Sequence, residues 1–445
     1  NSHGLFGKHS FALSEDENNA IWLAVNEGGL FKFNENFENI KDSYFSKFNY
    51  YLKSSNNFIN YNIQSITPDF KGNLWLLCTS GNLIRFNLKT NNFESFENIE
   101  GVLVSYQNSK LSQEISAQMI FGALETKGKL PVSIHNSFSE GHGLYSNSLS
   151  RLGYSIPEDV GLSSEKLSKI DSVAKVVISN KMAPGMQVLV ARKGKVVYHK
   201  TFGYHTDKKK VSVKKDNLYD VASMTKILAS LPMIMKLEEE KVFNFDTELG
   251  DLLPSLKNTN KSKITTLEAL SHVGRIKAWI PFYLFTLDSL TNKPSDTLYS
   301  VKKKGEFNLK VADDLYMKSD YANIMYDSIY TAEQRPRAGY KYSDLPYYLF
   351  KKFIENHYKK NLSELNKTYF YNSLGANYTT FNPLENFKRK NIVPTENDEY
   401  YRHQLVQGYV HDMGAAMLGG IGGHAGLFST ANDVAKLMQM YMLST

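Results

Sequence analysis

Ser223 and Lys226 are the residues of this chain whose types and spacing most directly suggest covalent chemistry. They stand three positions apart at the start of an apolar run, residues 227–235. On a helix, positions i and i+3 lie on one face, so the hydroxyl and the amine come within hydrogen-bond reach. A serine beside an amine that can take its proton is an activated nucleophile. The spacing therefore predicts a nucleophilic Ser223 with Lys226 as its base.

The same S-x-x-K pattern also occurs by chance, most often where a helix begins with a solvated lysine. The context of this copy favours the catalytic interpretation. Residues 220–222 indicate the end of an extended segment, and the run that follows is apolar nearly all round, which predicts a buried helix. A lysine on a buried helix must lose its proton or find an anion, because desolvation penalises the charged form. A lysine without its proton is what a general base requires.

A second element, Tyr342-Ser343-Asp344, stands shortly before the helical run 347–354. The order S-x-x-K, then Tyr-Ser-Asn/Asp ahead of a helix, resembles the penicillin-recognising serine hydrolases, which include class C β-lactamases, DD-peptidases and related esterases. The resemblance implies that Ser223 is acylated, that Lys226 takes its proton and that Tyr342 relays protons to the leaving group. Asp344 stands where the family usually has asparagine. Tyr321-Ala322-Asn323 has the same Y-x-N form and is the alternative, but the residues around Tyr342 match better.

The resemblance extends over the elements that must position these groups. Residues 182–190 and 196–198, joined by Lys193-Gly194-Lys195, are similar to the family's first β-hairpin, since Lys-Gly supplies a turn between two β-branched runs. Three segments, 394–398, 408–412 and 422–429, are similar to those of hydrolase domains fused behind family 3 glycoside hydrolases, which are common in Bacteroidetes. The resemblance implies a beta-lactamase/transpeptidase-like domain over residues 147–445, with an antiparallel sheet and a helical subdomain.

Three further residues are expected to support the active site through hydrogen bonds: His272, His411 and Asp412. His272 lies in residues 270–276, L-S-H-V-G-R-I, where the family has L-x-H-x-x-G-L, so an arginine occupies a glycine position. His424 is expected to line the cleft without a catalytic role. His424-Ala425-Gly426 is not assigned as the family's third motif, H-x-G, because residues 427–440 predict a polar cap and an amphipathic helix.

In the family, the strand with the third motif comes after this segment, and the present sequence ends at Thr445. That strand normally supplies one of the two backbone N–H donors of the oxyanion hole, and loss of one donor costs about 10² to 10³ in rate. We therefore expect the hydrolase domain to lack its C-terminal strands, to leave one edge of the hairpin unpaired and to have reduced activity.

The first 98 residues contain an internal repeat. Residues 21–34 align with residues 74–87 at one constant offset, and each copy reads as strand, glycine turn, strand. The pattern resembles the blades of sensor propellers in hybrid two-component regulators. A closed propeller needs about four blades or more. We therefore expect residues 1–98 to hold two propeller-like β repeats of an incomplete ring, with an ordinary β-meander as the alternative.

Residues 99–146 predict a short βαβ piece, with strands at 102–106 and 128–134 and a helix at 113–122. The segment resembles the tail of the second domain of a family 3 glycoside hydrolase. The barrel domain that carries the catalytic aspartate of those glycosidases is not in this sequence. We therefore expect no glycosidase activity from it.

The composition of the 445 residues argues against a membrane-spanning or a nucleic-acid-binding protein. An apolar content of 42% and an aromatic content of 13% are enough for real cores. No run of about 18 apolar residues predicts a transmembrane helix. The net charge of +7 comes mainly from scattered lysines, such as 208–210 and 302–304, which are most simply solvated, and no motif favours nucleic-acid binding.

No cofactor or metal is expected, because the eleven histidines are scattered and neither H-x-x-x-H nor C-x-x-C occurs. The single Cys78 excludes an internal disulfide. The sequence begins Asn1-Ser2-His3, without Met or a signal peptide, which suggests a mature form or an internal fragment.

Together these patterns predict an α+β multi-domain chain whose last part is a periplasmic or cell-envelope serine hydrolase. Its substrate is expected to be an amide or ester, either a small molecule or a peptidoglycan-derived peptide. The alternative is a non-catalytic chimeric or truncated chain that joins a sensor-propeller fragment to an incomplete hydrolase. The sequence determines neither the substrate nor the oligomeric state.

Overall fold

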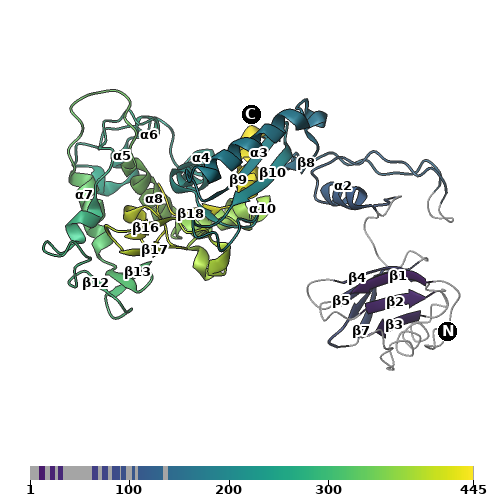
Figure 1. Ribbon diagram of the computed structural model, residues 1–445. Helices are drawn as coiled ribbons and strands as arrows, with labels where there is room; N and C mark the ends of the chain where they lie inside the picture. The colour runs from purple at the N-terminus through teal and green to yellow at the C-terminus, as the bar shows by residue number, and fades with distance from the viewer. Residues whose placement is uncertain are drawn as a thin grey trace. The chain divides into compact units, whose positions relative to one another are not determined.

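The computed structural model describes residues 10–15, 21–25, 29–33, 63–68, 73–78, 83–90, 92–96, 103–105, 109–133 and 139–443 (Figure 1). The chain forms two units, residues 1–107 and residues 108–445. The boundaries expected from the sequence, after residues 98 and 146, stay predictions.

The described residues of the first unit form two antiparallel sheets. One has the order β1 (Ser10–Glu15), β2 (Ile21–Val25), β3 (Gly29–Phe33), and the other has the order β4 (Ile63–Pro68), β5 (Asn73–Cys78), β6 (Leu83–Asn87), β7 (Asn92–Phe96). The repeated segments thus form two equivalent hairpins, β2-β3 and β5-β6. The rings of Trp22 and Phe86 meet edge to face at 5.8 Å, so the two sheets share one core. Their identity as propeller blades stays a prediction, and the turns at 26–28 and 79–82 lie outside the described residues.

The expected helix after this unit is present, but its flanking strands are not. α2 (Lys110–Ile120) begins at Ser109, whose side chain accepts a hydrogen bond from the N–H of Ser112. Residues 103–105 and 128–133 are not strands, so the βαβ prediction is wrong for them. Both segments are largely exposed and have no neighbouring strand, and a lone strand leaves its backbone groups unpaired. Residues 102, 106 and 134 lie outside the described residues.

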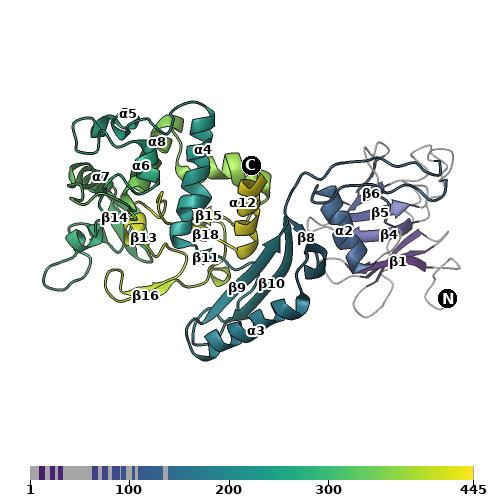
Figure 2. The same ribbon diagram turned by 90° about the horizontal axis from the view of Figure 1, so that it is seen from above.

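The second unit begins with the expected hairpin. β8 (Gly153–Tyr154), β9 (Gly185–Arg192) and β10 (Lys195–Gly203) form a sheet in the order β8-β10-β9. The hairpin turns at Lys193 and Gly194, both with positive φ, as a two-residue turn between twisted strands requires. α3 (Ser164–Ser179) starts at the N-cap Ser163 and packs against β10 (Figure 2).

The rest of this unit is mainly helical. Its α-helices are α4 (Leu231–Glu239), α5 (Leu249–Leu252), α6 (Thr266–Leu270), α7 (Tyr321–Thr331), α8 (Leu345–Tyr358), α9 (Leu362–Asn366), α10 (Asn372–Leu374), α11 (Met413–Ala416) and α12 (Ala431–Leu443). Single turns of 3₁₀-helix are η1 (Pro157–Val160), η2 (Ala222–Met224), η4 (Pro254–Leu256), η5 (Phe282–Thr286), η7 (Pro383–Glu385) and η8 (Arg389–Asn391), and π-helical turns are η3 (Lys226–Ser230) and η6 (Lys367–Tyr371). Short strands complete it: β11 (Tyr219–Asp220), β12 (Tyr299–Ser300), β13 (Phe307–Ala312), β14 (Leu315–Lys318), β15 (Thr380–Phe381), β16 (Glu396–Asp398), β17 (Gln404–Val406) and β18 (Leu427–Ser429).

The main core surrounds η3, α4 and α8. The π-helical turn and α4 bury Leu228, Met233 and Leu237, and α8 is buried along most of its length. The run was expected to be buried nearly all round, but Ile227 and Met235 are 39% and 41% exposed. Residues 226–230 form a π-helical turn, which adds one residue to the helical repeat, so the apolar residues of the run do not all face one side.

A small sheet brings together segments that are far apart in the sequence. β11, β18 and β15 pair in the order β11-β18-β15, with Asp220 opposite Phe428 and Thr380 on the other side of Phe428. The helix expected after Gly426 forms as α12. The strand β18 before it was not expected, because Leu427–Ser429 is only three residues long. This sheet fixes the end of β11, which leads into Ser223.

The edge of β9 that faces away from β10 borders an apolar groove. Among the described residues, β9 pairs only with β10, and a groove of about 610 Å³ lies between β9 and α12. The expectation that further strands belong here stays a prediction.

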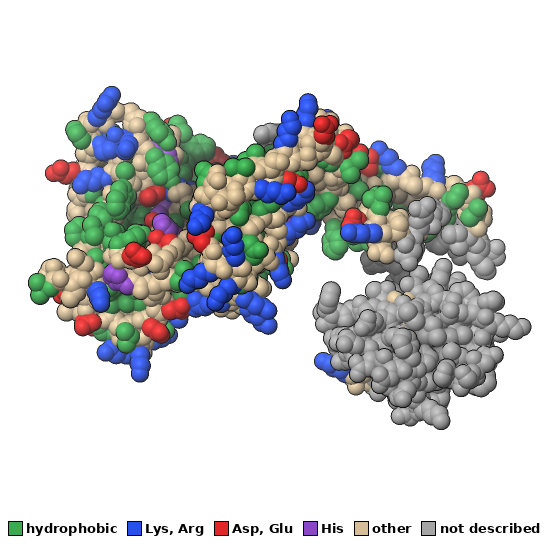
Figure 3. Space-filling model, viewed as in Figure 1, with side chains coloured by type: hydrophobic (Ala, Val, Ile, Leu, Met, Phe, Trp, Pro, Cys, Tyr) green, Lys and Arg blue, Asp and Glu red, His purple; other side chains and the backbone are tan. Residues whose placement is uncertain are grey.

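The surface of the second unit carries many lysines. Residues 208–210 and 302–304 are exposed, and Figure 3 shows Lys and Arg side chains over this face, with a group near the middle of the view. This agrees with the interpretation of the lysine runs as solvated surface. None of the helices in the described ranges is both long and apolar enough to cross a membrane.

Candidate active site

Ser223 lies in a tight turn directly after strand β11. Ala222, the residue before it, has a φ of +47°, in the left-handed region that costs an L-residue about 1–2 kcal/mol. Two side chains hold this conformation. Asp220 Oδ1 accepts a hydrogen bond from the Ala222 N–H at 2.8 Å, and Thr225 Oγ1 donates to the Ala222 carbonyl at 2.7 Å. The strained residue is therefore fixed on both sides, and the serine that follows it is fixed too.

The structure brings Ser223, Lys226 and Tyr342 together. Lys226 Nζ donates to Ser223 Oγ at 3.0 Å, and the Tyr342 hydroxyl donates to the same oxygen at 3.0 Å. Tyr342 is 119 residues away in the sequence. The alternative tyrosine, Tyr321, lies in α7, where it is buried in the core. The serine oxygen thus lies between an amine and a phenol, the two kinds of group that can take and return its proton.

Lys226 is almost completely buried, with 4% of its surface exposed. Besides Ser223 Oγ, its ammonium group contacts Asp344 Oδ1 at 2.7 Å and donates to the His424 carbonyl at 3.1 Å. It also lies over the rings of Tyr342 and Tyr347, at 5.0 and 5.5 Å from their centres. The Asp344 carboxylate can pair with the charged form of Lys226. The amine that remains when this form gives up its proton is the base that the Ser223 hydroxyl needs.

His272 holds Tyr342 in place. Its Nδ1 accepts a hydrogen bond from the Ser343 N–H at 3.2 Å, and its carbonyl accepts one from the Lys341 N–H at 3.0 Å. Its ring lies 4.8 Å from the ring of Tyr342. Burial lowers the pKa of His272, and the nearby Lys226 lowers it further, while Asp344 opposes the shift. These effects favour a neutral imidazole that accepts at Nδ1.

The loop after His272 is joined to the loop that carries Tyr342. Ser343 Oγ donates to the Lys277 carbonyl at 2.5 Å, and the Asp344 N–H donates to the Ala278 carbonyl at 2.8 Å. Arg275, at the position where the resemblance has glycine, has a φ of +58°, and its Nε donates to the Arg335 carbonyl at 2.7 Å. The left-handed backbone explains why glycine is preferred there. The hydrogen bond connects Arg275 to the loop that carries Tyr342.

Asp412 acts on the site through His424. Its Oδ1 lies 2.7 Å from His424 Nε2 and also accepts from the Ala415 N–H at 2.7 Å. Burial acts to raise the pKa of Asp412, but the charge and hydrogen bond of His424 hold it at about 2. His424 is 2% exposed and stacks on Tyr348 at 4.2 Å, so it does not line an open cleft as expected. Its carbonyl instead holds Lys226, a role that no side-chain pattern signals.

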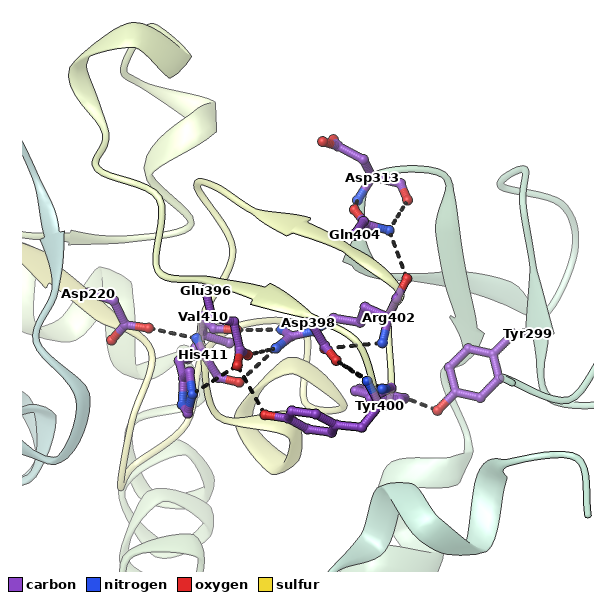
Figure 4. Close-up of polar contacts among 11 residues, drawn as sticks. Asp220, Tyr299, Asp313, Glu396, Asp398, Tyr400, Arg402, Gln404, Val410 and His411 are labelled. Atoms are coloured by element: carbon purple, nitrogen blue, oxygen red, sulfur yellow. Dashed lines mark hydrogen bonds and ion pairs between the residues drawn. The ribbon is translucent and has the colours of Figure 1, made fainter. Parts of the chain in front are cut away.

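His411 lies beside a buried cluster centred on Arg402, shown in Figure 4. Arg402 Nε contacts Asp398 Oδ2 at 2.6 Å, and its terminal nitrogens contact Glu396 Oε1 at 3.0 Å and the carbonyls of Val410 and His411 at 2.6 and 2.8 Å. The His411 imidazole lies 3.3 Å from Glu396 Oε2. Among the described residues, the His411 side chain therefore contacts this cluster and not Ser223, Lys226 or Tyr342.

The arrangement can perform acyl transfer. It contains a nucleophile with two proton-handling neighbours, and a set of loops that fixes each of them. Within the described ranges, no group of three or more His, Cys, Asp or Glu side chains could hold a metal ion.

One protein-family model and several curated proteins match this chain. The family model described as Beta-lactamase matches residues 174–444. A Salmonella gallinarum protein with the provisional name D-alanyl-D-alanine carboxypeptidase is 27% identical over 311 residues, which cover 64% of this chain and 66% of that protein. A Salmonella typhimurium protein of the same name is 26% identical over the same shares. The chain thus spans just under two thirds of the length of these curated relatives.

Two of the solved structures that resemble part of this chain have the following values. The octameric penicillin-binding protein homologue from Pyrococcus abyssi is 22% identical, with a TM-score of 0.46, over 62% of this chain and 56% of that chain. The D-alanine carboxypeptidase AmpC from Burkholderia cenocepacia is 14% identical, with a TM-score of 0.44, over 64% of this chain and 66% of that chain.

Proposed function

Because the chain belongs to the beta-lactamase family, and its C-terminal part has the α+β fold of beta-lactamases and transpeptidases, we propose that it is a serine hydrolase that forms an acyl-enzyme on Ser223. One observation carries the proposal: Ser223 Oγ lies 3.0 Å from both Lys226 Nζ and the Tyr342 hydroxyl. Both distances are within the reach that general acid–base catalysis requires.

In the acylation step, Ser223 Oγ attacks the carbonyl carbon of an amide or ester and its proton passes to the neutral form of Lys226. The bond from that carbon to the leaving group then breaks, and Tyr342 delivers a proton to the departing nitrogen or oxygen. Asp344 and the His424 carbonyl keep Lys226 in place during this step. The product is an ester between the substrate's acyl group and Ser223, together with the free amine or alcohol.

In the deacylation step, a water molecule attacks the ester carbon and gives one proton to the Lys226–Tyr342 pair. The bond to Ser223 Oγ breaks, and the oxygen regains a proton from the same pair. Both half-reactions consist of nucleophilic attack and proton transfer, which this set of side chains can perform without a cofactor.

For the substrate, we favour a peptide from peptidoglycan that ends in D-alanine, or a small amide or ester of similar shape. The name of the Salmonella relatives supports this choice. The lysine-serine-tyrosine arrangement can act on amides and esters alike. A place in the periplasm or cell envelope follows from the same proposal. From the sequence motifs, we also propose that the chain belongs to the fusion type common in Bacteroidetes. In this proposal, residues 1–98 are propeller-like repeats and residues 99–146 are the tail of a glycoside hydrolase domain.

Labelling with a fluorescent penicillin and a fluorophosphonate tests the proposal. Wild-type protein is expected to be labelled, and Ser223→Ala is expected to lose the label. Ser172→Ala is the matched control, because Ser172 is an exposed serine on α3. The alternative, a non-catalytic chain, predicts that a folded wild-type sample takes up neither probe, and that result would overturn the proposal.

A further inference from the structure

Asp220 stands three residues before Ser223, and its carboxylate joins two segments that are far apart in the sequence. Oδ1 accepts from the Ala222 N–H at 2.8 Å. Oδ2 accepts from the His411 N–H, 191 residues away, at 2.6 Å (Figure 4). Hydrogen bonds to an ionised carboxylate are roughly twice as strong as neutral ones. One carboxylate therefore fastens the nucleophile's turn to the loop that contains His411.

The peptide group between Val410 and His411 is held by charge at both ends. Its carbonyl accepts from the Arg402 guanidinium at 2.6 Å, and its N–H donates to the Asp220 carboxylate. A peptide dipole between a cation and an anion is polarised by both, and the two hydrogen bonds strengthen each other. The cation in turn is fixed, because the Arg402 side chain is fully buried against Asp398. A continuous series of bonds thus runs from the Arg402 cluster to Asp220.

We propose that Asp220 is a positioning residue that transmits the rigidity of the Arg402 cluster to Ser223, a role that rests on the hydrolase function proposed above. Ala222 makes the turn sensitive to this contact, because its φ of +47° is unfavourable for an L-residue and relaxes when the hydrogen bond to its N–H is lost. That relaxation rotates Ser223 away from Lys226 and Tyr342. A displacement of about 1 Å costs on the order of 10² in rate.

Asp220→Asn is the informative variant because it keeps the size of the side chain. An amide has one acceptor oxygen, and its NH₂ group faces a backbone donor, so one of the two hydrogen bonds is lost. The second-order rate constant for fluorophosphonate labelling of Ser223 is expected to fall at least tenfold. Asp216→Asn, at an exposed aspartate four residues earlier, is the matched control and is expected to label at the wild-type rate.

Amide hydrogen exchange of residues 221–225 and 410–412 provides a readout that does not depend on activity. Asp220→Asn is expected to speed exchange in both segments, while Asp216→Asn leaves it unchanged. Unchanged exchange, or a labelling rate within twofold of wild type, overturns the role of Asp220. If wild-type protein does not label at all, the hydrolase proposal fails, and exchange alone decides whether Asp220 holds the turn.

A second pair of variants covers the case in which Asp220→Asn does not fold. Glycine adopts a positive φ without strain, so in Ala222→Gly the backbone keeps its conformation without the hydrogen bond to Asp220. Asp220→Asn is then compared with Asp220 in this Ala222→Gly background, and the same two readouts apply. Because no strained residue is left to relax, labelling within twofold of the Asp220 form supports a role that acts through Ala222, and a fall of at least tenfold overturns it.

Discussion

Removal of the Tyr342 hydroxyl is expected to abolish most activity while it leaves the folded protein unchanged. The hydroxyl donates to Ser223 Oγ at 3.0 Å. The ring packs against His272 at 4.8 Å and lies 5.0 Å from Lys226 Nζ. Tyr342→Phe keeps both ring contacts and removes only the oxygen. The variant therefore separates proton transfer from packing.

The two effects have different expected sizes. A positioned acid or base contributes about 10² to 10⁴ in rate, which is about 3–5 kcal/mol of activation free energy at about 1.4 kcal/mol per tenfold. The side chain is 40% exposed, and changes at such sites alter the free energy of unfolding by about 0.5 kcal/mol or less. We therefore expect kcat to fall by about 10² to 10⁴, with no measurable change in stability.

Release of D-alanine from a peptide, or hydrolysis of an activated ester, gives kcat and KM for each variant, and urea denaturation gives the free energy of unfolding. Tyr340→Phe is the matched control. Tyr340 is 70% exposed on the same loop, and its ring meets His272 at 5.9 Å. A Tyr342→Phe variant that keeps more than about a third of the wild-type kcat would refute the role of the hydroxyl. An equal fall in kcat in Tyr340→Phe would show that the effect is not specific to the Tyr342 hydroxyl.

Three further predictions concern stability. Asp344→Asn removes the carboxylate that pairs with the buried Lys226, so urea denaturation should show a loss of about 1–3 kcal/mol, while Ser223 still labels; unchanged stability would contradict this. His424 holds the pKa of Asp412 at about 2 despite burial, so its carboxylate stabilises the fold above about pH 3.8 and loses this effect as pH falls to 2. Although the carboxylate makes buried contacts, 35% of the side chain is exposed to solvent, so Asp412→Asn should cost only about 1 kcal/mol at pH 7, and this cost should disappear as pH falls through about 2. Burial lowers the pKa of Lys261 from 10.5 to about 8, so the folded protein binds fewer protons than the unfolded chain between these values. Wild type should therefore gain up to about 3 kcal/mol over Lys261→Met as pH rises from 8 to 10.5, and a flat difference would contradict the shift.

The proposed reacting groups are easier to predict from the sequence than the residues that support them. Spacing points to Ser223 and Lys226, and the family resemblance of the Tyr-Ser-Asp motif points to Tyr342. The left-handed backbone at Ala222 could not be predicted, because it depends on hydrogen bonds from Asp220 and Thr225 that only the folded turn provides. His411 was selected for its imidazole, yet its contact with the site is its backbone N–H. Backbone contacts of this kind leave no signature in the residue type.

Lys261 shows a second limit of sequence reasoning. A lysine next to Asn260 and Lys263 suggests solvated surface, yet its side chain is fully buried, and Nζ donates to the carbonyls of Tyr330 and Ala332 at the end of α7. These carbonyls are unpaired because the helix ends there, so the cation satisfies them. Similarly, the pairing of Arg402 with Asp398 depends on the turn between β16 and β17, which was not predicted.

The fold was predicted most successfully where the pattern is local. The hairpin β9-β10 follows from its Lys-Gly turn, and α12 follows from the polar cap and amphipathic pattern after Gly426. The strands at 103–105 and 128–133 failed because a strand requires a partner, which a local pattern does not identify. The same reason explains why β18 was missed, since its three residues are a strand only through their pairing with β11 and β15.

The central claim, an acyl-enzyme on Ser223, is tested most directly by mass spectrometry of a trapped adduct. The protein is mixed with benzylpenicillin, quenched in acid and digested with trypsin, which releases Ser223 in the peptide of residues 216–226. This peptide is expected to gain the mass of one penicillin in wild type and not in Ser223→Ala. An adduct on another peptide, or no adduct on folded protein at any quench time, would contradict it.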